Sequence, residues 1–286
     1  MNSASSFGPA NLVQLAQYRA EIESNEPAFT YLTNGVDNEI VMTYAHLDQQ
    51  ARRIAAWLQS QNMFGQRVLL LYPPGLDFIA AYFGCLYAGA IAVPVYPPRR
   101  NRSILRIQSV ADSAQAAVAL TTEDVIKTVD GMLEEAPSLK NLAWLATSTL
   151  AEGLEEKWVF PNIDPETIAF LQYTSGSTGT PKGVILTHGN LLHNSQMIYQ
   201  GFEHTRTARG VFWLPSYHDM GLIGGIVQPL YCGRPNIIMS PLSFLQKPFA
   251  GLPPFRGTKE RPAAGQISHT IFASATLQKR KLMNST

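Results

Sequence analysis

The chain has 286 residues, of which 45% are apolar and 15% are charged, and its formal net charge is +1. A disordered chain needs low hydrophobicity and high net charge, so this class is excluded, and a charge of +1 gives no electrostatic attraction to nucleic acid. The two cysteines, Cys85 and Cys232, are too few and too far apart for a disulfide scaffold. At roughly 150 residues per domain, the length suggests about two domains.

The first expectations concern targeting and membranes. The opening sequence MNSASSFGPANLVQ lacks a basic start followed by an apolar run, so we expect no signal peptide and a cytoplasmic protein. The segment Phe78–Pro98 has no charged residue and is long enough to span a bilayer. Glycines and prolines interrupt it, and we therefore expect a buried helix over 76–87, a turn at Gly89 and a buried strand over 91–96, with no membrane insertion.

Helices and strands alternate over the first part of the chain. Thr43 can cap a helix that runs to about Gln61, and five apolar residues of this helix fall on one face: Leu47, Ala51, Ile54, Ala55 and Leu58. The pattern further predicts a strand over 67–72, a helix over 103–114 and a strand over 117–120. This alternation predicts an α/β fold of layered, mostly parallel sheets with helices on both faces.

A second α/β series follows an acidic, irregular segment. Residues 147–166 are interpreted as a linker between two lobes, about 1–146 and 167–249. After it we expect a strand over 168–173, a strand over 184–187, a helix over 190–202 and a strand over 211–214.

The segment YTSGSTGTPKGV, Tyr173 to Val184, carries the most specific chemistry. An apolar strand leads into three glycines, five hydroxyl side chains and one lysine, which is more than a simple turn needs. Glycines let backbone N–H groups point inward, hydroxyls add donors and Lys182 adds a positive charge, so the segment predicts a polyphosphate-binding loop. A flexible Gly/Ser linker is the alternative, and the flanking strands and Pro181 disfavour it. The segment is not a Walker-type loop, which needs Gly-Lys-Ser/Thr opening a helix, and no G-x-G-x-x-G is present.

The same segment resembles the signature of the adenylate-forming (AMP-binding) superfamily, which includes acyl-CoA synthetases, peptide-synthetase adenylation domains and luciferases. LPSYHDMGLIGG, Leu214 to Gly225, resembles the aromatic-His-Asp element of that family. Further segments are most similar to fatty acyl-AMP ligases: LLLYPPGLDFIAAYFGCLYAGAIAVPVYPP, IAFLQYTSGSTG, HGNLLHN and SPLSFLQKPF. The resemblance covers about 6–249 and implies an incomplete N-terminal domain of an adenylate-forming enzyme.

The resemblance implies a reaction in which a fatty acid and ATP, with Mg²⁺, give acyl-AMP and pyrophosphate, and the acyl group passes to an acyl carrier protein. The loop would hold the β- and γ-phosphates through Thr174, Ser175, Gly176, Ser177, Thr178, Gly179 and Lys182. Lys182 would offset charge on the departing pyrophosphate, and His218 would lie near the carboxylate and the α-phosphate. Family elements that hold adenine, ribose and Mg²⁺ are missing here, as is the small C-terminal domain with its catalytic lysine.

Each assignment has a structural alternative. His218 could be a structural histidine between Tyr217 and Asp219, although its place after the loop and strand favours a functional role. The small apolar residues after it, from Met220 to Gly225, are either an acyl pocket or ordinary core. The arginines between 99 and 106 are interpreted as a solvated helix start rather than a phosphate or carrier-protein contact. The other histidines are interpreted as structural, and no metal site is expected, because His188 and His193 are five residues apart and do not share a helical face.

Residues 250–286 differ from the rest. They carry a charge of +5, whereas the other 249 residues carry −4, and they contain no Tyr or Trp. Relatives continue after SPLSFLQKPF with an amphipathic helix and a Gly-Gly-Pro-Asn turn. One base added after the Phe249 codon allows, with permitted codons, RWLAAISRYK followed by GTTSGGPNFAYDLCVSNVTEE. We therefore expect an out-of-frame tail, with no stable place in the fold, on a truncated ligase.

Four functions compete. The first is a fatty acyl-AMP ligase, and the second is an acyl-CoA synthetase, which differs in using coenzyme A as acceptor. The third is a non-catalytic fragment that at most binds nucleotide or acyl chain weakly, which we favour for the activity of this chain. The fourth is a membrane protein, which would need detergent to stay in solution.

Overall fold

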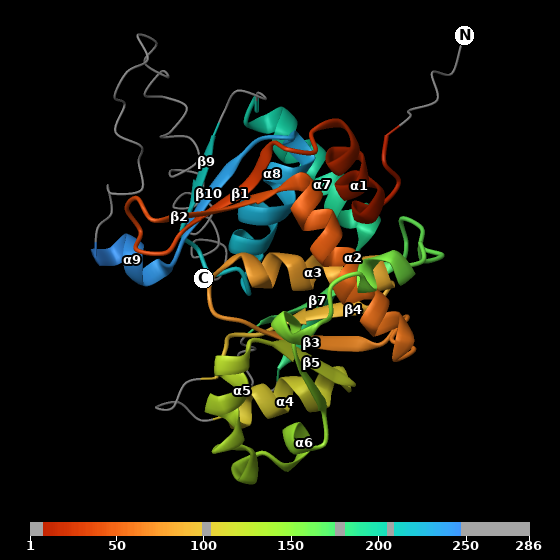
Figure 1. Ribbon diagram of the computed structural model, residues 1–286, viewed down its shortest axis with the longest axis vertical. Coiled ribbons are helices and arrows are strands. Elements are labelled where there is room, and N and C mark those ends of the chain that lie inside the picture. The colour runs from red at the N-terminus through yellow and green to blue at the C-terminus, as the bar shows by residue number, and fades with distance from the viewer. Residues whose placement is uncertain (1–7, 99–103, 175–180, 205–208, 247–286) are drawn as a thin grey trace, which may run out of the picture.

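The computed structural model describes residues 8–98, 104–174, 181–204 and 209–246 (Figure 1). Within these ranges the α-helices are α1 (Leu12–Ile22), α2 (Tyr44–Ser60), α3 (Leu76–Ala88), α4 (Leu105–Ala114), α5 (Glu123–Asp130), α6 (Pro137–Lys140), α7 (His188–Gly201), α8 (Gln228–Cys232) and α9 (Pro241–Gln246). The strands are β1 (Pro27–Leu32), β2 (Glu39–Thr43), β3 (Arg67–Leu71), β4 (Ile91–Pro94), β5 (Val118–Thr121), β6 (Ala143–Ala146), β7 (Ile168–Thr174), β8 (Lys182–Thr187), β9 (Gly210–Phe212) and β10 (Asn236–Met239). Three short 3₁₀ turns are η1 (Leu133–Glu135), η2 (Thr147–Thr149) and η3 (Leu154–Lys157), and η4 (Met220–Val227) is a π-helix.

The described strands form two sheets. The larger has the order β6-β5-β3-β4-β7-β8, with parallel neighbours except for the antiparallel pair β7–β8. The smaller has the order β2-β1-β10-β9, with β10 parallel to both its neighbours and β2 antiparallel to β1. The predicted α/β class with mostly parallel sheets is therefore confirmed. Strands from both sides of residues 147–166 share each sheet, and the division into two lobes stays a prediction.

Helices fill the space between the two sheets and cover the outside of the larger one. In Figure 1, α2 and α3 lie between the smaller sheet and the larger sheet, with α1, α7 and α8 beside them, while α4, α5 and α6 lie beyond the larger sheet. Two buried clusters match these layers, one around α1, α2 and α3 and one under α4, α5 and α6. Apolar faces of helices and sheets are buried against each other in this way because water is excluded from both.

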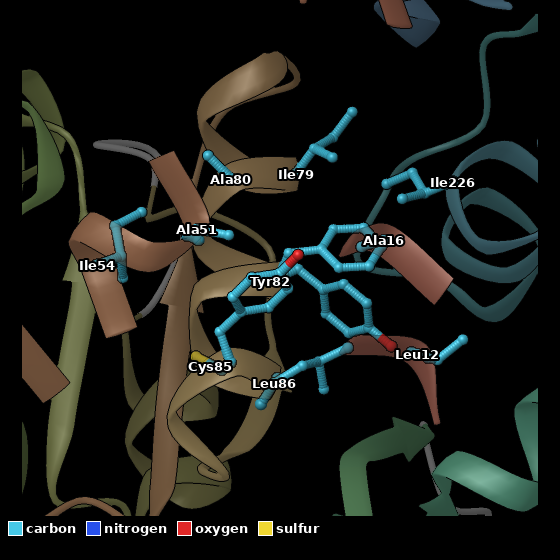
Figure 2. Close-up of a cluster of buried hydrophobic side chains, with 14 of the residues drawn as sticks. Leu12, Ala16, Ala51, Ile54, Ile79, Ala80, Tyr82, Cys85, Leu86 and Ile226 are labelled. Carbon is cyan, nitrogen blue, oxygen red and sulfur yellow. The ribbon is translucent and has the colours of Figure 1, made fainter. Parts of the chain in front are cut away.

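Helix α3 is the centre of the larger cluster. Every residue from Phe78 to Ala88 is buried, which explains why this stretch carries no charge. Figure 2 shows its side chains between α2, at Ala51 and Ile54, and α1. A Cβ on Gly84 would lie 2.5 Å from Cγ2 of Ile54, so this glycine lets α2 and α3 approach closely. Among the described residues, no helix has the length and apolar character needed to cross a membrane.

The sequence-based boundaries are mostly confirmed. Thr43 caps α2, with Oγ1 accepting from the N–H of His46 at 3.2 Å, and all five residues of the predicted apolar face are buried. Gly89 ends α3 in the left-handed region, at φ +68°. Strand β4 stops at Pro94, two residues earlier than expected.

The segment between β6 and β7 is fixed to α2 by polar contacts. Arg53 donates two hydrogen bonds to the Glu155 carboxylate, at 2.8 and 2.9 Å, and Gln59 exchanges two hydrogen bonds with Val159. The Arg53 guanidinium lowers the pKa of Glu155 to about 2. The acidic residues of this segment therefore include one, Glu155, that forms a specific ion pair, and are not there for solvent exposure alone.

His188, the first residue of α7, joins that helix to α1. Its Nδ1 accepts a hydrogen bond of 3.3 Å from the N–H of Leu12, and the side chain is 1% exposed. An acceptor at Nδ1 requires the neutral ring, and burial holds the pKa of His188 at about 4.

Acid should therefore destabilise the fold through His188. Between pH 6.5 and 4 the unfolded chain binds a proton at this residue and the folded chain does not, so the free energy of unfolding falls as pH is lowered through this window. The substitution His188→Asn, which keeps an acceptor but does not titrate, is expected to remove about 2–3 kcal/mol of this pH dependence. Urea unfolding at several pH values measures it. The exposed His193→Asn is the control, and equal pH slopes for the two variants would contradict the expectation.

Candidate active site

The two ends of the predicted phosphate loop face each other across an antiparallel strand pair. Thr174 ends β7 and Lys182 begins β8, and the register places them directly opposite, with both side chains exposed. The predicted residues Ser175, Gly176, Ser177, Thr178 and Gly179 lie outside the described residues. The structure thus brings together Thr174 and Lys182, and the roles of all seven residues stay a prediction.

Thr174, where β7 ends, lies at the edge of the sheet where ligands bind in α/β proteins. Strand β7 runs parallel to β4, with Phe170 opposite Ala92, and both strands end on the same side. The crevice outside the carboxyl ends of parallel strands is the general binding position of open α/β sheets. Lys182 is exposed at this edge, and it makes no ion pair with the other described residues.

His218 comes from the other sheet, in a tight turn after β9. Its N–H donates to the Pro215 carbonyl at 3.0 Å, and its carbonyl accepts from the N–H of Leu222 at 2.8 Å. Asp219 caps the helix that follows, with Oδ1 accepting from the N–H of Met220 at 2.8 Å. The backbone of His218 is fixed in this way while its side chain is exposed.

Two contacts join this turn to the larger sheet. The Gln172 side chain on β7 donates from Nε2 to the Tyr217 carbonyl at 3.2 Å. The ring of Tyr217 packs edge-on against Tyr96, which follows β4, with centroids 6.3 Å apart. The turn that carries His218 is therefore attached to the two strands beside the phosphate loop.

The helix after His218 is a π-helix, from Met220 to Val227. π-helical segments are rare in proteins, and those that do occur are often found at functional sites. Its glycines face close neighbours: a Cβ on Gly221 would collide with the Pro215 carbonyl, and Cβ atoms on Gly224 and Gly225 would press on the Phe212 ring at 3.1 and 3.2 Å. Leu222 and Ile226 belong to the buried core, and an acyl pocket here stays a prediction.

The substitution Gly221→Ala tests this packing. The added methyl meets backbone, which cannot rotate away, so we expect a loss of about 1–3 kcal/mol in the free energy of unfolding. Gly131→Ala is the control, because nothing lies within 4 Å of a Cβ there and its φ of −73° suits alanine. Thermal unfolding of both variants measures the difference, and an unchanged midpoint for Gly221→Ala would show that the helix yields at no cost.

Two other histidines make their contacts elsewhere, and His269 lies outside the described residues. His188 contacts α1, and His204 lies near Cys232 and Arg234, with ring-nitrogen distances of 3.4 Å to each. Burial lowers the pKa of His204 to about 4. Within the described ranges no group of three or more His, Cys, Asp or Glu residues could hold a metal ion. The predicted arginine cluster lies outside the described residues except for Arg106, which is exposed on α4.

Sequence reasoning did not identify Gln172 as part of the site. A signal was present, because Gln172 is a polar residue in an otherwise apolar strand, IAFLQYT, and it is only 7% exposed. Buried polar side chains are usually held by a specific partner. The partner, a carbonyl 45 residues further along the chain, could not be found from sequence spacing.

Two mostly parallel sheets with helices packed on them define an α/β domain, in which an apolar strand enters a segment rich in glycine and hydroxyl groups and the next strand begins at a lysine. Residues 17–252 match the family of AMP-binding enzymes, and the chain belongs to that family. The predicted resemblance is thereby confirmed.

Curated proteins similar to this chain include ligases named for fatty acids. The chain is 42% identical over 247 residues to the medium-chain-fatty-acid–[acyl-carrier-protein] ligase JamA of Moorena producens, covering 85% of this chain and 42% of JamA. It is 33% identical over 243 residues to the long-chain-fatty-acid–AMP ligase FadD32 of Mycolicibacterium smegmatis, covering 84% of this chain and 38% of FadD32. The chain thus spans about two fifths of the length of these relatives.

Solved structures agree in fold. The fatty acyl-adenylate ligase of L. pneumophila, in complex with acyl adenylate and pyrophosphate, superposes with a TM-score of 0.79 at 39% identity, covering 87% of this chain and 43% of that one. McyG, complexed with phenylalanyl-adenylate, gives a TM-score of 0.76 at 23% identity over 84% of this chain and 43% of that one, and shows the fold alone.

Proposed function

We propose that the chain supplies the phosphate loop and the His218 turn of a fatty acid–AMP ligase. The enzyme joins the carboxylate of a fatty acid to the AMP part of ATP, which gives acyl-AMP and releases pyrophosphate. It then passes the acyl group to an acyl carrier protein. The observation that carries the proposal is the pairing of Thr174 with Lys182 at the binding edge of the sheet, in a chain 39% identical to a ligase solved with acyl adenylate and pyrophosphate. JamA, named for transfer to a carrier protein, supports the choice of acceptor.

The chemistry asks the protein for positioning and charge stabilisation, because a carboxylate is a weak nucleophile. Backbone N–H groups at Gly176 and Gly179 and hydroxyls at Thr174, Ser175, Ser177 and Thr178 would bind the β- and γ-phosphates. Lys182 would offset the charge that develops on pyrophosphate as it leaves. His218, on a fixed backbone with an exposed ring, would donate a hydrogen bond to the carboxylate or the α-phosphate.

Mg²⁺ enters this proposal as a companion of ATP. The described residues offer no cluster of metal ligands, and Mg²⁺ commonly keeps waters and binds through substrate phosphates. We place the protein in the cytoplasm, a location that its two free, buried cysteines suit, since disulfides persist in oxidising compartments.

A second candidate is a chain that adenylates nothing by itself. The observation that favours it is the coverage of about two fifths of the relatives. A pyrophosphate-release assay with ATP, Mg²⁺ and a medium- or long-chain fatty acid decides between the two. It is run on the 286-residue chain and on a fused ligase, in which residues 1–246 are joined in frame to the remaining part of JamA.

We expect fatty-acid-dependent pyrophosphate release from the fused ligase and none from the 286-residue chain. Mass spectrometry should then find acyl-AMP, and the acyl group should move to a phosphopantetheinylated carrier protein but not to coenzyme A. Turnover by the 286-residue chain would remove the second candidate. A fused ligase that binds ATP yet releases no pyrophosphate with any fatty acid would refute the proposed function.

A further inference from the structure

The two parts of the candidate site belong to different sheets. Thr174 and Lys182 lie on β7 and β8 of the larger sheet, whereas His218 follows β9 of the smaller sheet. Displacement of a catalytic group by about 1 Å can cost on the order of 10²-fold in rate. Some contact must therefore hold the His218 turn in a fixed position relative to the phosphate loop.

We propose that Gln172 is the positioning residue that sets His218 against the phosphate loop, through its hydrogen bond to the Tyr217 carbonyl. This role in catalysis rests on the proposed function; the structural anchor does not. Gln172 is two residues before Thr174, and the carbonyl that it binds is one residue before His218. A single side chain thus spans the gap between the two parts of the site.

The direction of the Gln172 side chain follows from strand geometry. Side chains alternate along a strand, so Gln172 shares a face with Phe170, which is fully buried and packs against Tyr82 of α3. That face looks toward the helical layer between the sheets. The next residue on the same face is Thr174. Phe170, Gln172 and Thr174 therefore follow one another on one face of β7, from the buried core to the end of the strand, where the loop begins.

The chemistry of the contact requires a donor, which the Gln172 amide supplies. The Tyr217 carbonyl can only accept, so Nε2 must face it and Oε1 must point elsewhere. Oε1 is buried and has no hydrogen-bond partner in the described structure. A buried acceptor without a partner is destabilising, so an apolar side chain of equal size would suit the core better. The amide is thus explained by what it holds and not by the stability of the strand.

The contact is also distinct from the other contacts that fix the turn. The bonds from the His218 N–H to Pro215 and from the Leu222 N–H to His218 lie within the turn and the π-helix. The Gln172 bond reaches the other sheet, and the Tyr96–Tyr217 ring contact supports the same connection without a directed hydrogen bond.

The chain contains a matched control. Gln228 is 1% exposed, its Nε2 donates to the Ser195 carbonyl at 3.2 Å and also lies 3.3 Å from Cys232 Sγ and 3.4 Å from His204 Nδ1, and its Oε1 has no partner in the described structure. It lies at the far end of the π-helix, at the start of α8. Substitution of either glutamine by methionine, which has a similar length, removes one donor of the same kind.

The first experiment measures amide hydrogen exchange on the 286-residue chain at His218, Met220 and Leu222. We expect about three- to tenfold faster exchange at these amides in Gln172→Met, as the loss of one hydrogen bond implies. Exchange should stay within twofold of wild type in Gln228→Met, and exchange in β3 and β4 should be unchanged in both. Unchanged exchange at His218 in Gln172→Met, or a general increase that includes β3 and β4, would overturn the proposal.

The second experiment measures kinetics on the fused ligase. Gln172→Met is expected to lower kcat for acyl-AMP formation about 10- to 100-fold with KM for ATP within threefold, because the phosphate loop itself is intact. Gln228→Met should leave both constants unchanged. Faster exchange with an unchanged kcat would refute the positioning role. A wild-type fused ligase that binds ATP but turns over no fatty acid would refute the proposed function, while the exchange experiment still decides whether Gln172 holds the turn.

Discussion

The substitution Tyr82→Ala is expected to lower the free energy of unfolding by about 3–5 kcal/mol, the range for large aromatic side chains removed from a core. Tyr82 is fully buried in α3 and packs on three rings. Centroid distances are 6.5 Å to Phe78, 5.5 Å to Phe83 and 5.9 Å to Phe170. Phe170 lies on β7, so the substitution leaves a cavity between the central helix and the strand that leads to the phosphate loop.

The control for this expectation is Tyr82→Phe. The Tyr82 hydroxyl is buried and has no partner within the described structure, so its removal should be neutral or stabilising. Tyr87→Phe should instead cost about 1.5–3 kcal/mol, because the Tyr87 hydroxyl donates to the Asp48 carboxylate at 2.8 Å. Urea unfolding of the three variants measures the order. A loss above about 1 kcal/mol for Tyr82→Phe would mean that its hydroxyl is paired in solution.

Local sequence patterns were enough to predict the helices whose burial follows a regular pattern along the chain. The apolar face of α2 repeats with the helical period, and Thr43 supplies a cap of the expected kind. Helix α3 is buried on all sides and Gly89 ends it, so an uncharged apolar run followed by glycine was a sufficient signal. Length alone does not distinguish this run from a membrane span. Only the structure shows that it is packed among the two sheets and their helices.

Long-range pairing could not be predicted. Strand β1 pairs with β10, where Phe29 lies opposite Asn236, and no local pattern specifies a partner about 200 residues away. The π-helix was also missed, because its glycines are explained by contacts with Phe212 and Pro215 that exist only in the folded chain. At the site, the motif predicted Lys182 and His218, but the attachment of the His218 turn to β7 depends on tertiary structure.

The substitution His218→Ala in the fused ligase is expected to lower kcat for acyl-AMP formation by about 10²–10³-fold, the usual loss when one preorganised donor is removed from a site where charge develops. The expected stability change is small, because the His218 side chain is exposed and packs against the neighbouring Tyr217 ring, with centroids 5.0 Å apart. Pyrophosphate release and thermal unfolding are measured on the same preparation.

The control His193→Ala removes an equally exposed histidine from α7 and should leave kcat unchanged. His218→Asn separates the possible roles of the ring, because asparagine keeps a donor but cannot transfer a proton. Recovery of part of kcat in His218→Asn would assign a hydrogen-bonding role, and no recovery would assign a role specific to imidazole. A kcat within threefold of wild type in His218→Ala would instead make His218 the structural residue between Tyr217 and Asp219. Gln172 would then hold a turn whose function lies in its backbone and in the π-helix that begins there.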